Sequence, residues 1–304
     1  MSESLLGLSE ETFDDIADRV DAVFHAGALV DWVRPVEDCI GPNVVSTHEV
    51  FRMVSRDRAK VLHHVSAVST LSIHTGKVAV HYTTSTGLFS YGVSQENREY
   101  NYATSKYTAE RMVSAARWRG AKAIVYRLPF ITASVSSGHF RRDRGDFLHN
   151  LIAESVKIGP VPSLDADLSA VLPVDYLCKT IVAIATQDSS LVGLDFDFVD
   201  AQALSFRQFS DLLNEAGSGH SLVPFAQWRQ QALAYAAAHR TGPLARIAAL
   251  IDRLADEDEA AAMCKSASSG QHVLGGKAYL VLVVNQHSLR KYLGQIGRAC
   301  HATA

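Results

Sequence analysis

The 304-residue chain has no long apolar run and no excess of one charge. Because nothing in it is long and apolar enough to cross a bilayer, we expect no membrane partner. The net charge is −3 and no long basic run is present, which argues against nucleic acid as a partner. The acidic N-terminus lacks the pattern of a signal peptide.

Cysteine is scarce, and its four copies never form a C-x-x-C motif: Cys39, Cys178, Cys264 and Cys300. We interpret them as reduced and mostly packing thiols of an intracellular, cytoplasmic protein. The thirteen histidines do not cluster at the spacing of metal ligands. The pair His63–His64 falls on an expected strand and should point to both faces, so we expect no metal site.

A glycine-rich phosphate turn is also missing. None of the nineteen glycines forms G-x-G-x-x-G or G-x-x-G-x-x-G. Such a turn lets backbone N–H groups reach the pyrophosphate of a dinucleotide. If this chain binds a dinucleotide, it does so without the usual glycine-rich turn.

What the chain does have is alternating strand and helix patterns, with 47% hydrophobic residues to build a core. Helices are expected over 9–20, 43–55 and 101–118, and strands over 21–25, 60–68 and 122–127, with an irregular polar segment up to 94. Strands and helices alternating at this spacing predict an α/β fold with a parallel sheet and right-handed crossovers.

Beyond residue 131 the pattern changes. We expect a loop over 134–144, a helix over 146–156 and a turn-rich stretch over 159–167. A helix should follow Pro173, one more strand should occupy 194–199, and the chain from 205 onward should be mainly helical.

The stretch NYATSKYTAE (101–110) places Tyr102 four residues before Lys106, so both side chains should lie on one helix face. Of ten tyrosines, only Tyr102 has lysine at the fourth following position. An ammonium beside a phenol should lower the phenol's pKa and suit it to donate a proton to a carbonyl. An ordinary polar helix face is the alternative.

The strand 21–25 ends at His25 and runs into the small residues Ala26, Gly27 and Ala28, where an α/β fold brings its backbone close to a ligand. A tight turn that needs small residues explains them equally well. Together with Asn43, Ser66, the Tyr102–Lys106 pair and Arg127-Leu128-Pro129, they resemble an extended short-chain dehydrogenase/reductase.

Seven runs in order narrow this resemblance to the thioester reductase domain of fungal nonribosomal peptide synthetases, carboxylic acid reductases and aminoadipate reductases. The runs are HAGALVDWVRP, NVVSTHEV, HHVSAVSTL, YATSKYTAERMV, YRLPFITAS, GHFRRDRGDFLHN and LPVDYLCKTIVAI. The resemblance implies a partial, Rossmann-like dinucleotide-binding domain over 1–133. It also implies a smaller, mainly helical substrate- and carrier-facing region over 134–304, which contributes the strand near 194–199.

The family resemblance implies a reaction and its residues. NADPH would reduce a thioester on the phosphopantetheine arm of a carrier protein to an aldehyde or alcohol. Tyr102 would donate to the carbonyl oxygen, Lys106 would hold the nicotinamide ribose, and Ser66 would share the oxyanion. The stretch His25, Ala26, Gly27 and Ala28 would lie near the adenosine side, and Pro129 would line the nicotinamide.

Two departures from the family pattern stand out. The glycine-rich turn belongs upstream of the segment that begins here at Leu5, so the sheet is expected to lack its first strands. The family usually has Thr or Ser where this chain has Ala67. Ser66 and Ser69 flank that position, and either one could supply the missing hydroxyl.

Two further groups have open interpretations. The cluster Arg141, Arg142 and Arg144 is either a phosphate anchor or a solvated loop. Asp175 and Tyr176 match a substrate-side run of the family, and we interpret them as mainly structural, with Asp175 as an early helix cap.

Two alternatives compete with an active thioester reductase. The missing glycine-rich turn and Ala67 favour a catalytically impaired remnant or accessory module that binds a carrier. A sugar-nucleotide epimerase or steroid-type dehydrogenase shares the Tyr-Lys pattern, but the runs RLPFITAS and PVDY argue against it.

Overall fold

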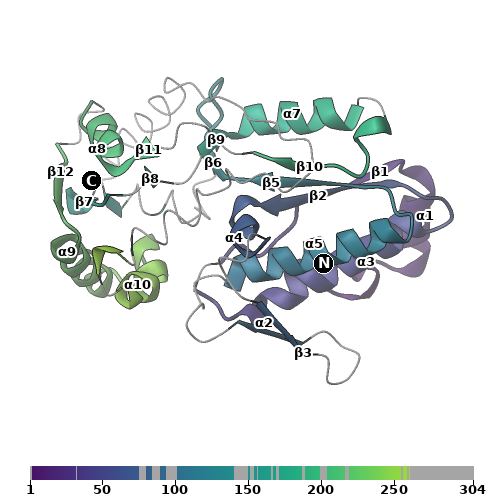
Figure 1. Ribbon diagram of the computed structural model, residues 1–304, viewed down its shortest axis with the longest axis horizontal. Coiled ribbons are helices and arrows are strands. Elements are labelled where there is room, and N and C mark those ends of the chain that lie inside the picture. Colours follow the sequence, from purple (N-terminus) through teal and green to yellow (C-terminus); the bar gives the residue numbers. More distant parts are fainter. Residues whose placement is uncertain are drawn as a thin grey trace. The chain divides into compact units, whose positions relative to one another are not determined.

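The computed structural model describes residues 2–31, 33–74, 80–83, 90–93, 101–139, 150, 154–155, 157–165, 167–168, 171–186, 189–198, 204–215, 219–254, 256–258 and 260. It divides into two compact units (Figure 1). Unit 1 spans Met1–Leu128 and Ile181–Phe198, and unit 2 spans Pro129–Thr180 and Val199–Ser269.

Unit 1 is built on a four-stranded parallel sheet of order β1-β2-β5-β10. Its strands are β1 (Ala22–His25), β2 (Val61–Ala67), β5 (Ala123–Leu128) and β10 (Asp195–Asp197). All four were predicted from short apolar runs, and the α/β fold with a parallel sheet is confirmed. A parallel sheet brings the carboxyl ends of its strands to one edge, where ligands bind in such folds.

Helices α3 (Ser46–Ser55) and α5 (Asn101–Trp118) cover one face of this sheet (Figure 1). The remaining helices of unit 1 are η1 (Ser4–Gly7), α1 (Glu10–Arg19), α2 (Val36–Cys39), the π-helical η2 (Ile40–Val45), η3 (Val68–Thr70), α4 (Leu71–His74) and η5 (Ser189–Leu191). Ser9 caps α1 by accepting from the Thr12 backbone N–H at 3.2 Å, as predicted.

The two faces of the sheet differ in chemistry. The face packed on α3 and α5, here called the helix face, carries Leu62, His64 and Ser66 of β2, which alternate along the strand. The opposite face, here called the aromatic face, carries a row of stacked rings, Phe24, His63, Tyr126 and Phe196, with centroids 4.4–5.9 Å apart. Side chains of the same strand thus contribute to both faces.

The segment between β2 and α5 was predicted to be irregular, and this prediction was wrong. It contains η3, α4 and two antiparallel strands, β3 (Val80–Thr83) and β4 (Ser90–Val93). The turn-rich interpretation of 159–167 was wrong as well, because Pro160–Ser163 form strand β7. Pairing with a partner strand decides such short strands, and local composition does not reveal that pairing.

In its described residues, unit 2 contains three small two-stranded sheets: β6 with β9 and β7 with β12, both parallel, and β8 with β11, antiparallel. Its strands are β6 (Phe130–Thr132), β7 (Pro160–Ser163), β8 (Asp167–Leu168), β9 (Val171–Pro173), β11 (Leu204–Ser205) and β12 (Ser221–Pro224). Its helices are α8 (Phe206–Glu215), α9 (Phe225–Ala238) and α10 (Pro243–Arg253), and α7 (Val174–Thr186) continues into unit 1.

The core of unit 2 is apolar and lies between α9 and α10. Phe225, Trp228, Leu244 and Ile247 are buried in it. The helical character predicted from residue 205 onward is confirmed for α8, α9 and α10. The rest of this predicted helical region beyond residue 260 lies outside the described residues. Most of the helix predicted over 146–156 lies outside them too, as do Arg141, Arg142 and Arg144. No described helix has the length and hydropathy to span a bilayer.

Candidate active site

Tyr102 and Lys106 lie in the first turns of α5, on the helix face of unit 1. Both side chains are buried, with 8% and 2% of their surface exposed. The Lys106 ammonium donates to the backbone carbonyl of Val65 in β2 at 2.7 Å. Lys106 is therefore held against the second strand of the sheet, near its carboxyl end.

Asn43 ties the start of α5 to the turn that follows β1. Its amide nitrogen donates to Ser105 Oγ at 2.9 Å and to the Leu29 carbonyl at 3.1 Å, and its Oδ1 accepts from the Leu29 N–H at 2.7 Å. Ser105 Oγ in turn donates to the Tyr102 carbonyl at 2.7 Å. One buried amide thus fixes the position of Tyr102 relative to the strand end.

The prediction that Lys106 lowers the pKa of Tyr102 was wrong. Burial raises the pKa of the Tyr102 phenol, and the nearby Cys39 thiol raises it further. A charged phenolate would lose its hydration in this interior, and Lys106 is not among the groups that offset this loss. The phenol therefore stays protonated at neutral pH and remains a proton donor.

Burial also lowers the pKa of Lys106, to about 8, although the carboxylate of Glu110 opposes this change. Lys106 and Glu110 are one turn apart on the same face of α5, so the carboxylate stabilises the ammonium. The ammonium form still predominates at pH 7, but the amine is within reach near pH 8.

The two serine hydroxyls at the end of β2 differ in their hydrogen bonding. Ser66 Oγ donates to Glu110 Oε1, whereas Ser69 Oγ is buried and has no hydrogen-bond partner in the described part of the chain. The 3₁₀ turn η3 begins directly after Ala67, so the strict alternation of the strand ends there.

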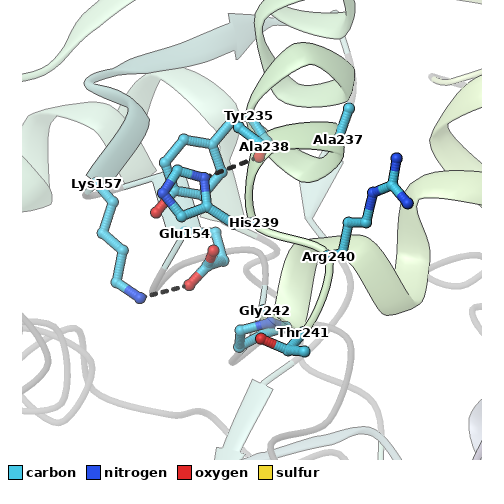
Figure 2. A pocket seen from close by; sticks show the side chains of 10 residues that line it. Glu154, Lys157, Tyr235, Ala237, Ala238, His239, Arg240, Thr241 and Gly242 are labelled. Carbon is cyan, nitrogen blue, oxygen red and sulfur yellow. Dashed lines mark hydrogen bonds and ion pairs between the residues drawn. The ribbon is translucent and has the colours of Figure 1, made fainter.

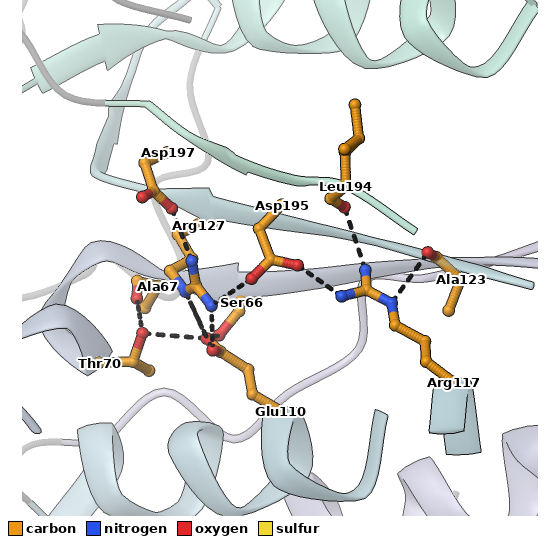
Figure 3. Close-up of polar contacts among 10 residues, drawn as sticks. All are labelled: Ser66, Ala67, Thr70, Glu110, Arg117, Ala123, Arg127, Leu194, Asp195 and Asp197. Carbon is orange, nitrogen blue, oxygen red and sulfur yellow. Dashed lines mark hydrogen bonds and ion pairs between the residues drawn. The ribbon is translucent and has the colours of Figure 1, made fainter. Parts of the chain in front are cut away.

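Glu110 belongs to a buried ion network that the sequence analysis missed (Figure 3). Arg127 binds Glu110 Oε2 at 2.7 Å, Asp195 Oδ2 at 2.8 Å and Asp197 Oδ1 at 2.8 Å. Arg117 binds the other oxygen of Asp195 at 2.6 Å. The network joins α5, β5 and β10 beneath the site. The alternation of Asp195 and Asp197 along one strand was the available signal.

The predicted cofactor stretch begins with His25, whose side chain is buried against α3. Its Nε2 lies 3.0 Å from Thr47 Oγ1, and burial foremost, with the Lys106 charge second, lowers its pKa to about 4. Ala26 and Ala28 are exposed and Gly27 is partly exposed at the carboxyl end of β1. The backbone of 26–28, rather than the imidazole, is open to a ligand.

Three other residues singled out from the sequence belong to unit 2. Pro129 is buried and directly follows β5 in the chain. Asp175 accepts from the backbone N–H groups of Val135 and Ser136, each at 3.2 Å, and from the Ser134 hydroxyl at 3.1 Å. Asp175 therefore organises the 134–136 loop, which agrees with a structural role, while Tyr176 is half-buried beside it.

Unit 2 also has a cavity of about 460 Å³ at the junction of α9 and α10 (Figure 2). Buried Glu154 pairs with Lys157 at 2.7 Å, and His239 stacks on Tyr235 at 4.0 Å. None of the predicted site residues lines this cavity. Its buried carboxylate is neutralised by the adjacent lysine, so the cavity shows no chemistry related to the Tyr102–Lys106 pair.

Comparison with known proteins places these features in a family. Residues 1–181 match the family model NAD_binding_4, described as male sterility protein. The chain is 47% identical over 290 residues to the PKS-NRPS hybrid synthetase acdB of Aspergillus candidus, covering 95% of this chain and 11% of the synthetase. It is 27% identical over 242 residues to L-2-aminoadipate reductase of Saccharomyces cerevisiae, covering 76% of this chain and 17% of that protein.

Among solved structures, the chain resembles the terminal R domain from the myxalamid PKS-NRPS pathway, with a TM-score of 0.75 and 25% identity. The match covers 98% of this chain and 73% of that domain. The resemblance inferred from the seven sequence runs is thus confirmed. With its parallel sheet, its α5 helix and a family match across 1–181, the chain belongs to the NAD-binding family described as male sterility protein.

Proposed function

We propose that this chain reduces a carrier-bound acyl or peptidyl thioester to an aldehyde or alcohol, with NADPH as the reductant. The observation that carries the proposal is the buried Tyr102–Lys106 pair at the carboxyl ends of parallel strands. The 47% identity to a PKS-NRPS hybrid synthetase and the match to a terminal R domain support this substrate class. The reaction would release the product of a secondary-metabolite assembly line.

We infer that residues at this edge contact the cofactor. Ala26, Gly27 and Ala28 offer backbone with little side-chain bulk, and Ser69 offers a buried hydroxyl without a partner in the described chain. We expect Lys106 to hold the ribose, the stretch His25–Ala28 to contact the cofactor through its backbone, and Pro129 to line the nicotinamide. When bound, the cofactor supplies the hydride.

The protein's own groups would stabilise the charge that develops on the thioester oxygen. Tyr102 stays protonated because burial raises its pKa, so its hydroxyl can donate to that oxygen. Ser69 is the better second donor, because the Ser66 hydroxyl is already bound by Glu110. Lys106 would restore the proton that Tyr102 gives up.

The alternative is a catalytically impaired module that binds a carrier domain without reducing its cargo. Two observations favour it: the sequence contains no glycine-rich phosphate turn, and Ala67 replaces the hydroxyl usual in the family. Calorimetric titration with NADPH and with NADH separates the two functions. Reduction requires saturable binding of NADPH, and no heat of binding at millimolar cofactor would exclude it for this chain.

The catalytic assignment is tested by NADPH oxidation with an acyl-pantetheine thioester as the substrate. Tyr102→Phe should lower kcat by at least about 100-fold while leaving the affinity for NADPH nearly unchanged. Tyr107→Phe, which removes a neighbouring phenol from the same helix, is the matched control and should retain activity. Equal rates in the two variants would refute the role of Tyr102.

A further inference from the structure

Trp118, the last residue of α5, has 91% of its surface exposed and is the most exposed large hydrophobic side chain among the described residues. A tryptophan side chain offers about 200 Å² of mainly apolar surface that is more stable out of water. Tryptophan and arginine are also the residues that most often dominate the energy of protein interfaces. Trp118 therefore marks a candidate contact surface on unit 1.

Basic side chains surround this indole. Arg111 lies seven residues before Trp118, on the same face of α5, and Arg119 follows it directly. Lys122 lies in the turn before β5. All three basic side chains are exposed, and none makes an ion pair with another described residue. We call this set the basic stripe: Arg111, Trp118, Arg119 and Lys122.

Helix α1 carries the opposite charge at a matching spacing. Glu11, Asp15 and Asp18 are exposed at positions i, i+4 and i+7, while Phe13 is buried against the core. We call these three carboxylates the acidic stripe. Asp15 pairs with Arg19 at 3.1 Å, but both side chains are mostly exposed, and such a surface pair contributes little. The acidic stripe thus remains available to a cationic surface.

Within one molecule the two stripes do not meet, because α3 lies between them. Helix α1 packs on α3 through Phe13 and Met53, and α3 packs in turn on α5. The three helices form one layer on the sheet, acidic at one border and basic at the other. Its middle adds little net charge, since Arg52 of α3 is paired with Glu49 at 3.0 Å.

We propose that unit 1 binds a second copy of this chain through this helix layer, in a two-fold symmetric dimer. A two-fold axis running along α3 places the acidic stripe of each copy on the basic stripe of the other. This is the self-complementary arrangement that a symmetric interface requires. The proposal does not depend on the proposed reaction.

The topology of the sheet sets the level at which the stripes meet. Helices α1 and α5 both end at the edge where the parallel strands begin, so the axis brings Trp118 level with Arg19 of the second copy. An arginine stacked on an indole forms a favourable cation–π contact. Tyr102 lies about 24 Å away along α5, so this contact is far from the candidate active site.

The first test is sedimentation velocity of the full chain at about 100 μM protein. The wild type should be a dimer in low salt and should dissociate as salt screens the paired charges. A wild type that is monomeric in low salt would overturn the proposal, as would a dimer that salt does not weaken.

The second test exchanges the charges of the stripes. Arg111→Glu with Arg119→Glu makes both stripes acidic, and Glu11→Arg with Asp18→Arg makes both basic. Each double variant alone should dimerise at least about tenfold more weakly than the wild type, because like charges then face each other. Mixed in equal amounts, the two variants should form a heterodimer in which every stripe again meets its opposite. If the mixture stays monomeric, the assigned pairing is wrong.

The last comparison isolates the indole. Trp118→Ser should also weaken the dimer at least about tenfold, whereas Arg246→Glu, an exposed change on α10 of unit 2, should leave it intact. All substituted side chains are exposed, so urea midpoints should stay close to the wild type. Trp118→Ser decides the matter should a charge variant fail to fold. Wild-type association in folded Trp118→Ser would refute this surface.

Discussion

The helix face and the aromatic face of the unit 1 sheet are built by the same strands but stabilised by different chemistry. On β5, Arg127 points to the helix face and binds three carboxylates, while its neighbour Tyr126 stacks between aromatic rings on the other. On β2, His64 and His63 divide in the same way. One residue step along a strand thus separates a charged interior from a hydrophobic one.

This difference explains why the buried charged groups lie on the helix face. Buried charges need partners fixed in position, and the helix face provides them from α5, β5 and β10. Rings on the aromatic face need only contact, and the half-exposed Phe24 continues their row. The helix face should therefore be sensitive to charge and pH, and the aromatic face mainly to side-chain volume.

Arg127→Met should produce the largest loss of stability. The substitution leaves Glu110 and Asp197 buried without the Arg127 guanidinium, and Asp195 loses one of its guanidinium partners. Breaking a buried ion pair from one side costs about 3–5 kcal/mol, so urea unfolding should show a shift of at least this size. A loss below about 1 kcal/mol would mean that the network contributes little to stability.

Acid should weaken the helix face next. The pKa of His25 is about 4 in the folded chain against 6.5 when exposed, so between these values only the unfolded chain binds the proton. The contribution of His25 to the free energy of unfolding is therefore constant above pH 6.5. It falls by about 3 kcal/mol as the pH drops toward 4. Urea midpoints of His25→Asn should fall less steeply with pH; parallel curves for variant and wild type would contradict the assignment.

The two serines at the end of β2 should differ in their effect on catalysis. If Ser69 is the second oxyanion donor, Ser69→Ala should lower kcat for thioester reduction on the order of a hundredfold, or about 2.7 kcal/mol. Ser66→Ala should act mainly on the free energy of unfolding and less on kcat, because its hydroxyl donates to Glu110. The reverse order in a steady-state assay would return the role to Ser66.

Tyr126→Phe should have the smallest effect, and it completes the comparison on β5. The change removes one hydrogen bond, 2.8 Å long, between the phenol and His63 Nδ1, and leaves the ring stack intact. The expected loss is about 1 kcal/mol in urea unfolding, with NADPH affinity unchanged. A loss comparable to that of Arg127→Met would show that the two faces do not differ as described.

Much of the fold could be predicted because its elements carry local signals. The capping residue Ser9 predicts the start of α1, and short apolar runs predict β1, β2 and β5. Gly120, with a positive φ of 90°, predicts the end of α5. The Tyr102–Lys106 pair could be placed on one buried helix face from its spacing alone. Its cofactor and catalytic roles remain predictions.

What could not be predicted depends on partners distant in the chain. The sequence spacing between Arg127 and Asp197 is 70 residues, and nothing local indicates that they meet. The raised pKa of Tyr102 depends on how deeply α5 is buried, which spacing does not reveal. The partner of Ser66 depends on Glu110, so the choice between Ser66 and Ser69 required the fold.

The position of β10 has a consequence for synthesis of the protein. This strand pairs with β5, yet the ribosome makes it only after the intervening residues 129–180, which belong to unit 2. Until Asp195 and Asp197 emerge, the guanidinium of Arg127 has only Glu110 as a carboxylate partner among the residues of the network. Residues 1–128 should therefore remain incompletely folded on the ribosome. The fourth strand, β10, can pair with β5 only after synthesis has passed residue 198.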